Sequence, residues 1–319
     1  MVRTSGGSQD TSRPEKRCLS RQFRTREGGH RSRGEGQAVG GHLFPPPPVP
    51  YEGGEGQEGP PGQAFRLVDN LCVHWAFQKT SSKKSPGPDG VGPLAFRCLF
   101  MEWGTRRVEA LFRAHIRLGF HPARWKLARG VIIPKPEMND YSVAKAYRCI
   151  SLLNCLRKMA EKVAADLISR HCESSGGFQL GQYGCKAKRS AAGAVGMAIV
   201  QVQEAWSRGV TAGAALMDVA AAFPSVARGC LLRKLRETGV DKCLVRWADS
   251  FMRDRRVIMS VGGQDSDEMA VTTGLPRGSP VSPVLFTLYI ADIHQAVESQ
   301  VEDSRGISFV DDVTWIVEG

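Results

Sequence analysis

The segment Phe309–Ile316 constrains the fold of this chain more than any other. Two adjacent carboxylates, Asp311 and Asp312, interrupt short runs of β-branched and aromatic residues there. Because such runs favour strands and paired acids favour a turn, the sequence predicts a tight β-hairpin with both carboxylates at its tip. Neighbouring carboxylates repel each other unless a cation lies between them. The tip is therefore a candidate cation site.

A second apolar strand, Ala214–Met217, ends in another acid, Asp218. Two strand ends that present carboxylate oxygens can hold Mg²⁺, which typically takes one or two carboxylates together with substrate phosphates. Phosphoryl transfer at two metal ions is the chemistry that such a site serves. Taken alone, two such acids are more often surface turn residues, so the motifs around them decide the interpretation.

The order of motifs resembles the palm of a reverse transcriptase, and most closely that of non-LTR (LINE-type) retrotransposon polymerases. The loop Gly274–Phe286, with the sequence GLPRGSPVSPVLF, lies between the two acid strands. The likeness runs from Lys83 to Gly319 and includes SPGPDG at residues 85–90, YRCISLL at 147–153 and QYGCKAKRS at 182–190. It implies an RNA-directed DNA polymerase, a nucleotidyltransferase that uses an RNA template, a DNA primer and dNTPs. The implied cofactors are two Mg²⁺ ions, with Mn²⁺ as an alternative.

The resemblance also assigns roles to individual residues. Asp218, Asp311 and the backbone carbonyl of Val219 would bind the metal ions, with Asp312 in support, and all three aspartates count as catalytic. The residues implied for dNTP binding are Lys135, Arg148, Phe223, Arg277 and Gly278. Those implied for template–primer contact are Lys186, Lys188, Arg189 and Ser279. For Phe223, an aromatic gate against a 2′-hydroxyl and ordinary core packing remain equally open.

The predicted fold class is α+β, a polymerase fingers–palm fragment with an antiparallel palm sheet and helices packed on one side. We expect a fingers hairpin from a strand within residues 125–136 that ends at Pro134 and from the segment 147–154, and a further pair of strands at residues 257–263 and 269–272. A helix after Leu156 should place Lys158, Glu161 and Lys162 on its wet face. Helices are also expected over 191–206, where the loss of Thr at Ala191 removes a cap, and over 280–297.

Composition divides the chain into three parts. Residues 1–62 are rich in Gly and Pro and poor in large apolar residues, so they are predicted to be disordered and dispensable for folding. Residues 63–116 form a helical extension that contains PGPDG, and residues 117–319 form the reverse transcriptase domain. The sequence ends seven residues beyond Asp312. We therefore expect a truncated domain that lacks the thumb and extends primers weakly or not at all.

Charge and hydropathy indicate the kind of partner and the cellular location of the protein. Forty-three Lys and Arg against thirty-two Asp and Glu leave a net charge of +11, which favours a polyanionic partner. No apolar run approaches the ~20 residues of a spanning helix, and no signal peptide is evident, so we expect an intracellular protein, nuclear or cytoplasmic. The nine cysteines lack metal-site spacing and are expected to be reduced.

Two alternatives remain open for the function: a group II intron maturase-like enzyme, and a non-catalytic nucleic-acid-binding or inert remnant of a transposon copy. Protein partners are not predicted.

Overall fold

The structure, a computed structural model, describes residues 62–319 except 101–104, 144–145, 220 and 262–263. The predicted disordered segment lies outside the described residues apart from Gly62. The helices are η1 (Ala64–Leu67), α3 (Asn70–Gln78), α4 (Pro93–Phe100), α5 (Thr105–Leu118), η2 (Ala123–Trp125), α6 (Cys155–Ser174), α7 (Ala191–Ser207), α8 (Arg228–Glu237), α9 (Lys242–Met252), α10 (Ser282–Tyr289) and α11 (Ala291–Glu298). The strands are β1 (Leu127–Pro134), β2 (Tyr147–Leu152), β3 (Ala212–Asp218), β4 (Arg255–Val261), β5 (Gln264–Asp265), β6 (Met269–Val271), β7 (Ser304–Phe309) and β8 (Asp312–Glu318).

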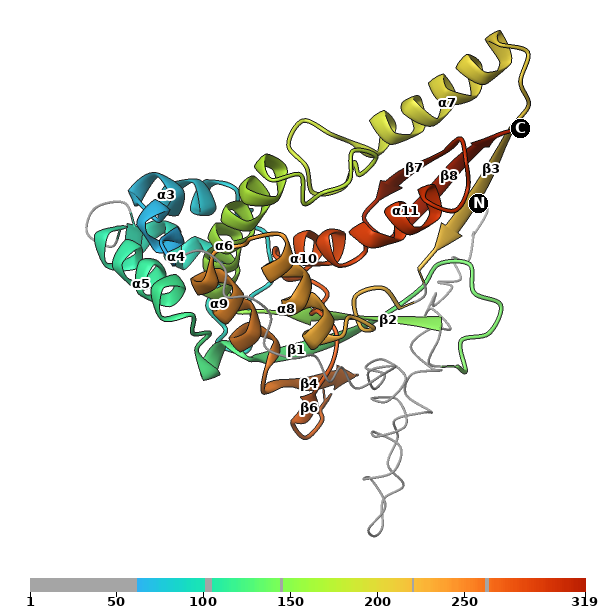
Figure 1. Ribbon diagram of the computed structural model, residues 1–319. Helices are drawn as coiled ribbons and strands as arrows, with labels where there is room; N and C mark the ends of the chain where they lie inside the picture. Colours follow the sequence, from blue (N-terminus) through green and yellow to red (C-terminus); the bar gives the residue numbers. More distant parts are fainter. Residues whose placement is uncertain (1–61, 101–104, 144–145, 220, 262–263) are drawn as a thin grey trace, which may run out of the picture.

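The strands form two separate sheets, and the predicted α+β class is confirmed (Figure 1). The three-stranded sheet has the order β3-β8-β7 and is antiparallel throughout. The other sheet has the order β2-β1-β4-β5, with β6 also paired to β4. The predicted antiparallel pairing of the sheet that carries the acids is therefore present. In the second sheet β1 runs parallel to β4, a pairing that the sequence patterns do not predict because the two strands are far apart in sequence.

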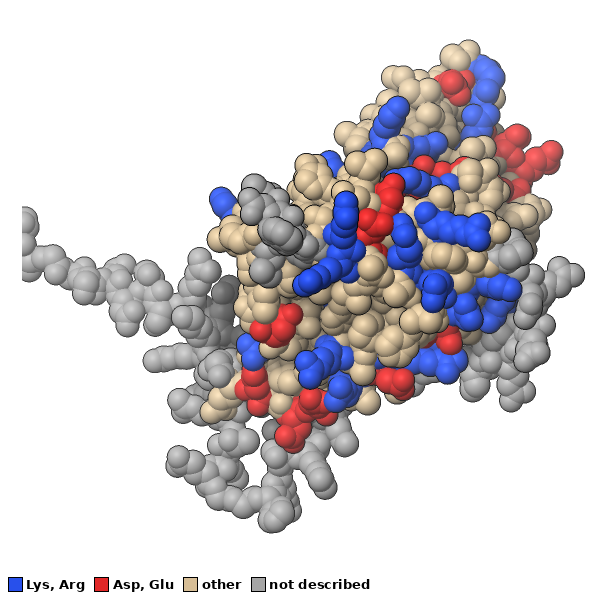
Figure 2. Space-filling view, turned by 90° about the vertical axis from the view of Figure 1, so that its left-hand side faces the viewer, with Lys and Arg blue, Asp and Glu red and all other residues tan. Residues whose placement is uncertain are grey.

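Basic side chains are spread over the molecular surface. Figure 2 shows Lys and Arg distributed across the face that carries α3 and α5, with Asp and Glu between them. Helix α5 alone contributes Arg106, Arg107, Arg113 and Arg117. No helix in the described part of the chain is both long and apolar enough to cross a lipid bilayer.

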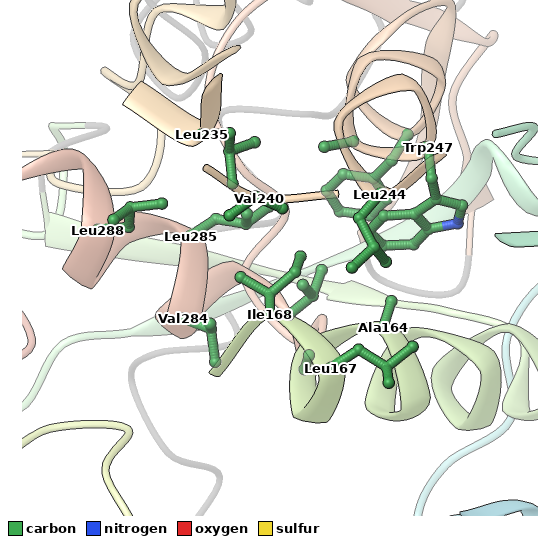
Figure 3. Packing of buried hydrophobic residues seen from close by; sticks show 14 of the residues in the cluster. Ala164, Leu167, Ile168, Leu235, Val240, Leu244, Trp247, Val284, Leu285 and Leu288 are labelled. Carbon is green, nitrogen blue, oxygen red and sulfur yellow. The ribbon is translucent and has the colours of Figure 1, made fainter. Parts of the chain in front are cut away.

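The main core lies where α6, α8, α9 and α10 meet (Figure 3). Helix α6 contributes Ile168, α9 contributes Trp247 and α10 contributes Leu285, and each of these side chains is fully buried. Full burial of one such side chain stabilises the fold by about 1.5–3 kcal/mol. This core joins α10, which follows the Gly274–Ser279 loop, to α6, which follows β2. The loop before α10 and the helix after β2 are therefore packed on one common core.

Helix starts follow from capping side chains. Asp69 accepts a hydrogen bond from Cys72 N at the start of α3, and Asp241 accepts one from Cys243 N at the start of α9. Ser190 caps α7 by accepting from Gly193 N at 3.1 Å. The expected loss of a cap at Ala191 is therefore wrong, because the neighbouring serine supplies the oxygen.

The single helix expected over residues 280–297 is two helices. Helix α10 begins at Ser282, with Pro283 in its first turn, and α11 follows after Ile290. Ile290 has φ −90° and ψ 0°, and its N–H still bonds Phe286 O, but the next bond closes over three residues from Ile293 N to Ile290 O. Ile290 is itself buried, so the break lets a core side chain pack while α11 turns toward β7.

Candidate functional site

The Asp-Asp motif forms a tight hairpin, as the sequence predicts. The last pair of the β7–β8 ladder is formed by Phe309 and Asp312, so only Val310 and Asp311 make the turn. Val310 has φ +61°, a left-handed conformation that a β-branched side chain rarely adopts. Hairpin turns of two residues require such positive φ values and usually place glycine there. The turn therefore carries backbone strain beside the two carboxylates.

Asp218 lies opposite Asp312 in the three-stranded sheet. The antiparallel register of β3 and β8 pairs these two residues directly at the end of β3. Directly opposed residues have Cβ atoms about 5 Å apart, so two carboxylates meet at one sheet end with Asp311 beside them. Val313, the next residue of β8, points to the opposite face by alternation and is buried. Asp218 and Asp312 are both exposed, and Figure 1 shows this end of β3 directed toward the middle of the molecule.

The donors at this sheet end suit a hard cation. Carboxylate oxygens are what Mg²⁺ prefers, and it needs only one or two of them when substrate phosphates and waters complete its shell. Within the described ranges, no three side chains of the His, Cys, Asp or Glu type lie close enough together to hold a metal ion unaided. Two carboxylates at one sheet end thus fit a cation whose remaining ligands come from phosphates and waters.

The loop Gly274–Ser279 is held against the segment that follows β3. Gly274 N donates to Val226 O at 3.0 Å and Leu275 N donates to Phe223 O at 2.7 Å. Gly274 has φ +72°, and a Cβ atom there would lie 2.4 Å from the Pro224 backbone, so only glycine allows this approach. Phe223 is half-buried, and its ring lies 5.3 Å from that of Phe286.

The other side of the same loop contacts β2. Ser151 N donates to Arg277 O at 2.8 Å, and a Cβ on Gly278 would lie 2.6 Å from Ser151 O. The loop therefore bridges the β1–β2 hairpin and the segment after Asp218. The Arg277 side chain is half-exposed.

A buried polar network holds the end of this loop. The Ser279 hydroxyl donates to Glu161 Oε2 at 2.6 Å, and Arg157 Nε donates to Glu161 Oε1. Arg157 also donates to the carbonyl of Trp125. Glu161 is 0 % exposed, so its predicted place on the wet face of α6 is wrong. His121 lies 3.9 Å from Glu161, but burial, and then the charge of Arg157, hold the His121 pKa well below its usual range, which keeps it neutral.

Ser279 is predicted to contact template–primer, yet its side chain lies inside the protein. It is only 4 % exposed, and its hydroxyl is used by Glu161. In this arrangement the serine side chain fixes the loop, and any contact with nucleic acid would come from the neighbouring backbone. The sequence contains the glutamate and the serine but gives no sign that they meet across 118 positions.

Lys135 and Arg148 lie on one face of the β1–β2 hairpin. Arg148 pairs with Ile133, and Lys135 N donates to Ala146 O at 2.8 Å, so alternation places both cations on the same side. Arg148 is exposed and Lys135 half-exposed. No carboxylate pairs with either in the part of the chain that the structure describes. The Tyr141 hydroxyl donates to Lys135 O at 2.7 Å and folds the loop beside them.

The cations of the 182–190 motif differ in their surroundings. Lys186 Nζ donates to Gln179 O at 2.7 Å, and Arg189 Nη1 donates to Leu180 O at 2.5 Å. The Arg189 guanidinium also lies 4.7 Å from the Tyr183 ring centroid. These two cations therefore hold their own loop together. Lys188 is exposed and makes no ion pair among the described residues.

Sequence comparison identifies relatives of the chain. Residues 133–319 match the family model described as reverse transcriptase (RNA-dependent DNA polymerase). The chain is 27% identical over 235 residues to a probable RNA-directed DNA polymerase from transposon X-element of Drosophila melanogaster, covering 74% of this chain and 26% of that protein. It is 27% identical over 267 residues to a putative 115 kDa protein in type-1 retrotransposable element R1DM of the same species, covering 82% and 24%.

A third relative is the RNA-directed DNA polymerase from mobile element jockey of Drosophila funebris. The identity is 26% over 215 residues, which cover 67% of this chain and 23% of that polymerase. The chain thus spans about a quarter of the length of the curated relatives it matches. The likeness to non-LTR retrotransposon polymerases that the motifs predict is confirmed. With its family model matched from the β1–β2 hairpin through the Asp-Asp turn, the chain belongs to the reverse transcriptase (RNA-dependent DNA polymerase) family.

Proposed function

We propose that this chain carries the fingers and palm of a retrotransposon reverse transcriptase, which adds dNTPs to a primer 3′-hydroxyl along an RNA template. In this proposal β3-β8-β7 is the palm sheet and β1–β2 is the fingers hairpin. The observation that carries it is the register of β3 and β8, which pairs Asp218 with Asp312 and sets Asp311 in the adjoining turn. Incorporation of dNTP that requires an RNA template, a divalent metal and Asp218 is the test.

The carboxylates would hold the divalent cations of the reaction. Asp218 and Asp311 are the proposed ligands for two Mg²⁺ ions, with Mn²⁺ as an alternative, the Val219 carbonyl as a further ligand and Asp312 in support. When bound, such ions lower the pKa of the attacking hydroxyl and neutralise charge on the triphosphate. The protein contributes a fixed distance between the two strand ends through the β3–β8 ladder.

Nucleotide binding would involve residues from three neighbouring elements. Lys135 and Arg148 would bind the triphosphate from one face of the hairpin. There the lysine ammonium acts as a point charge, and the arginine guanidinium can donate two parallel hydrogen bonds. Phe223 would lie beside the sugar, and its contact with Phe286 would keep its ring fixed. Gly278 and Arg277, on the loop that bonds Ser151, would lie beside the base pair.

Removal of both fingers cations should weaken dNTP binding selectively. In Lys135→Ala/Arg148→Ala, we expect the KM for dNTP to rise roughly tenfold to a hundredfold, because hydrogen bonds to charged groups each contribute about 1.5–3 kcal/mol. The rate at saturating dNTP should change less. Steady-state primer extension with varied dNTP measures both quantities.

Arg129 provides the matched control for that change. It lies on β1, on the same face of the hairpin as the two cations, but its guanidinium is paired with Asp265 at 2.7 Å. Arg129→Ala should leave the KM for dNTP within about twofold. An equal rise in KM for the control and for the double variant would contradict the assignment.

Template–primer binding should depend steeply on salt, since contacts with phosphate release counterions. Neutralising the exposed Lys188 should lower the slope of log affinity against log salt by about one. Lys234→Gln is the matched control, because Lys234 is already neutralised by an ion pair with Asp292. Fluorescence anisotropy with an RNA–DNA hybrid measures the slopes, and affinity independent of salt would contradict the proposed contact.

A further inference from the structure

The Asp311–Asp312 turn is supported by a segment 128 residues earlier in the chain. Gln182 forms a parallel bridge with Ser308, and two backbone bonds flank that bridge. Tyr183 N donates to Ser308 O at 2.7 Å, and Ser308 N donates to Gly181 O at 2.9 Å. The segment Gly181–Gly184 therefore lies along β7 like a short extra strand.

Glycine at both ends of this segment permits the contact. A Cβ on Gly181 would lie 1.8 Å from Gly306 O, and a Cβ on Gly184 would lie 2.6 Å from Val310 N. Any side chain at either position would push the segment off the hairpin. The segment thus follows the hairpin from the middle of β7 to the strained residue of the turn.

The side chain of Gln182 completes the support. It is 2 % exposed, and its Oε1 accepts hydrogen bonds from Gly184 N at 2.6 Å and from Val310 N at 3.2 Å. Val310 is the residue with φ +61°. A strained conformation persists only where surrounding contacts over-determine it, and this amide oxygen is the one side-chain acceptor for the Val310 N–H among the described residues.

We propose that Gln182 is a positioning residue for the catalytic turn, because its amide oxygen holds the strained Val310 N–H and so fixes where the Asp311 and Asp312 carboxylates lie. The role in catalysis rests on the proposed function, whereas the role in turn geometry does not. Arg189 reinforces the same segment, since its guanidinium also donates to Gln182 O at 3.1 Å. The motif at residues 182–190 thereby acts on the turn through contacts between protein groups.

Gln182→Met tests the proposal, because methionine keeps the length of the side chain and removes the acceptor. Hydrogen exchange of the Val310 amide should accelerate about tenfold or more when its partner is lost. The Tyr183 amide, which bonds backbone, should keep its protection. In primer extension, kcat should fall about tenfold or more while the KM for dNTP stays within about twofold, with the melting temperature lowered by only a few degrees.

Gln201→Met is the matched control. Gln201 is also buried, but its Oε1 has no hydrogen-bond partner, so the substitution removes a buried amide without breaking a bond to that oxygen. It should leave the Val310 exchange rate and kcat unchanged. Val310→Gly gives a second control, since glycine relieves the strain and Gln182→Met should then cost less in kcat than it does beside valine.

The outcomes separate this proposal from the proposed function. Unchanged exchange at Val310 in Gln182→Met would overturn the contact, and faster exchange with unchanged kcat would overturn the positioning role. A wild-type chain that incorporates no single dNTP even at saturating hybrid would refute the proposed function. The Val310 exchange rates would then decide alone whether Gln182 fixes the turn.

Discussion

Asp311→Asn is expected to abolish RNA-templated primer extension, with a loss of roughly 10³-fold or more, as for other residues that contact the reacting groups. The substitution keeps the shape of the side chain and removes the charge that would hold a divalent cation. Asp311 is one of two turn residues, and the ladder bonds of β7 and β8 do not use its side chain. The melting temperature should therefore stay within a few degrees of wild type, since Asn is well tolerated in turns.

Asp303→Asn is the matched control for that loss. Asp303 is an exposed aspartate with φ +54° directly before the same hairpin, at the end remote from the turn. Its substitution should change neither extension nor stability. Because metal binding is weakened rather than removed, raising the Mg²⁺ concentration should recover part of the activity of Asp311→Asn. Full activity of Asp311→Asn at low Mg²⁺ would contradict the proposed role.

Glu161→Ala is expected to cost the largest free energy of unfolding, about 3–5 kcal/mol, because it leaves the charge of Arg157 buried without its partner. Arg157 is 1 % exposed and, among the described residues, would keep its hydrogen bond to the Trp125 carbonyl and its contact with the Phe251 ring, but no carboxylate. The Ser279 hydroxyl would lose its acceptor at the same time. Thermal unfolding followed by circular dichroism should show a fall on the order of 10 °C.

An ion pair on the surface with the same spacing distinguishes the effect of burial on stability from the effect of losing a charge. Arg233 and Glu237 form an i,i+4 pair at 3.3 Å in which both side chains are 48% exposed, and the order of the residues matches that of Arg157 and Glu161. Glu237→Ala should lower the free energy of unfolding by less than about 1 kcal/mol. If Glu161→Ala were no more destabilising than Glu237→Ala, the buried network would not support the Gly274–Ser279 loop.

The elements that carry the proposed chemistry could be predicted from the sequence. Runs of β-branched and aromatic residues around the Asp-Asp pair predict the β7–β8 hairpin, and the apolar run before Asp218 predicts β3. The β1–β2 hairpin and α6 follow from local patterns in the same way. These features depend on residues a few positions apart, which is the range over which sequence patterns carry direct structural information.

The contacts that hold those elements together could not be predicted in this way. Arg157 and Glu161 have the spacing of an ordinary solvated ion pair, and only the packing of α6 against the loop makes them buried. The parallel pairing of β1 with β4 joins segments more than a hundred positions apart. The sequence shows Gln182 only as part of a motif next to basic residues, whereas in the structure its amide oxygen accepts a hydrogen bond from the turn residue Val310. Each of these contacts depends on tertiary structure, about which local periodicity carries no information.

The most direct test of the proposed polymerase site is incorporation of a single dNTP into an RNA-templated DNA primer, with the protein in excess over the hybrid so that tight retention of the primer is not needed. With Mg²⁺ present, the wild-type chain and Asp303→Asn should incorporate the complementary nucleotide. Asp218→Asn, Asp311→Asn and wild type with EDTA should not, because Asp218 lies opposite Asp312 beside the same turn. Absence of incorporation by wild type at saturating hybrid would contradict the account. So would incorporation by the Asp218 or Asp311 variant that equals that of wild type.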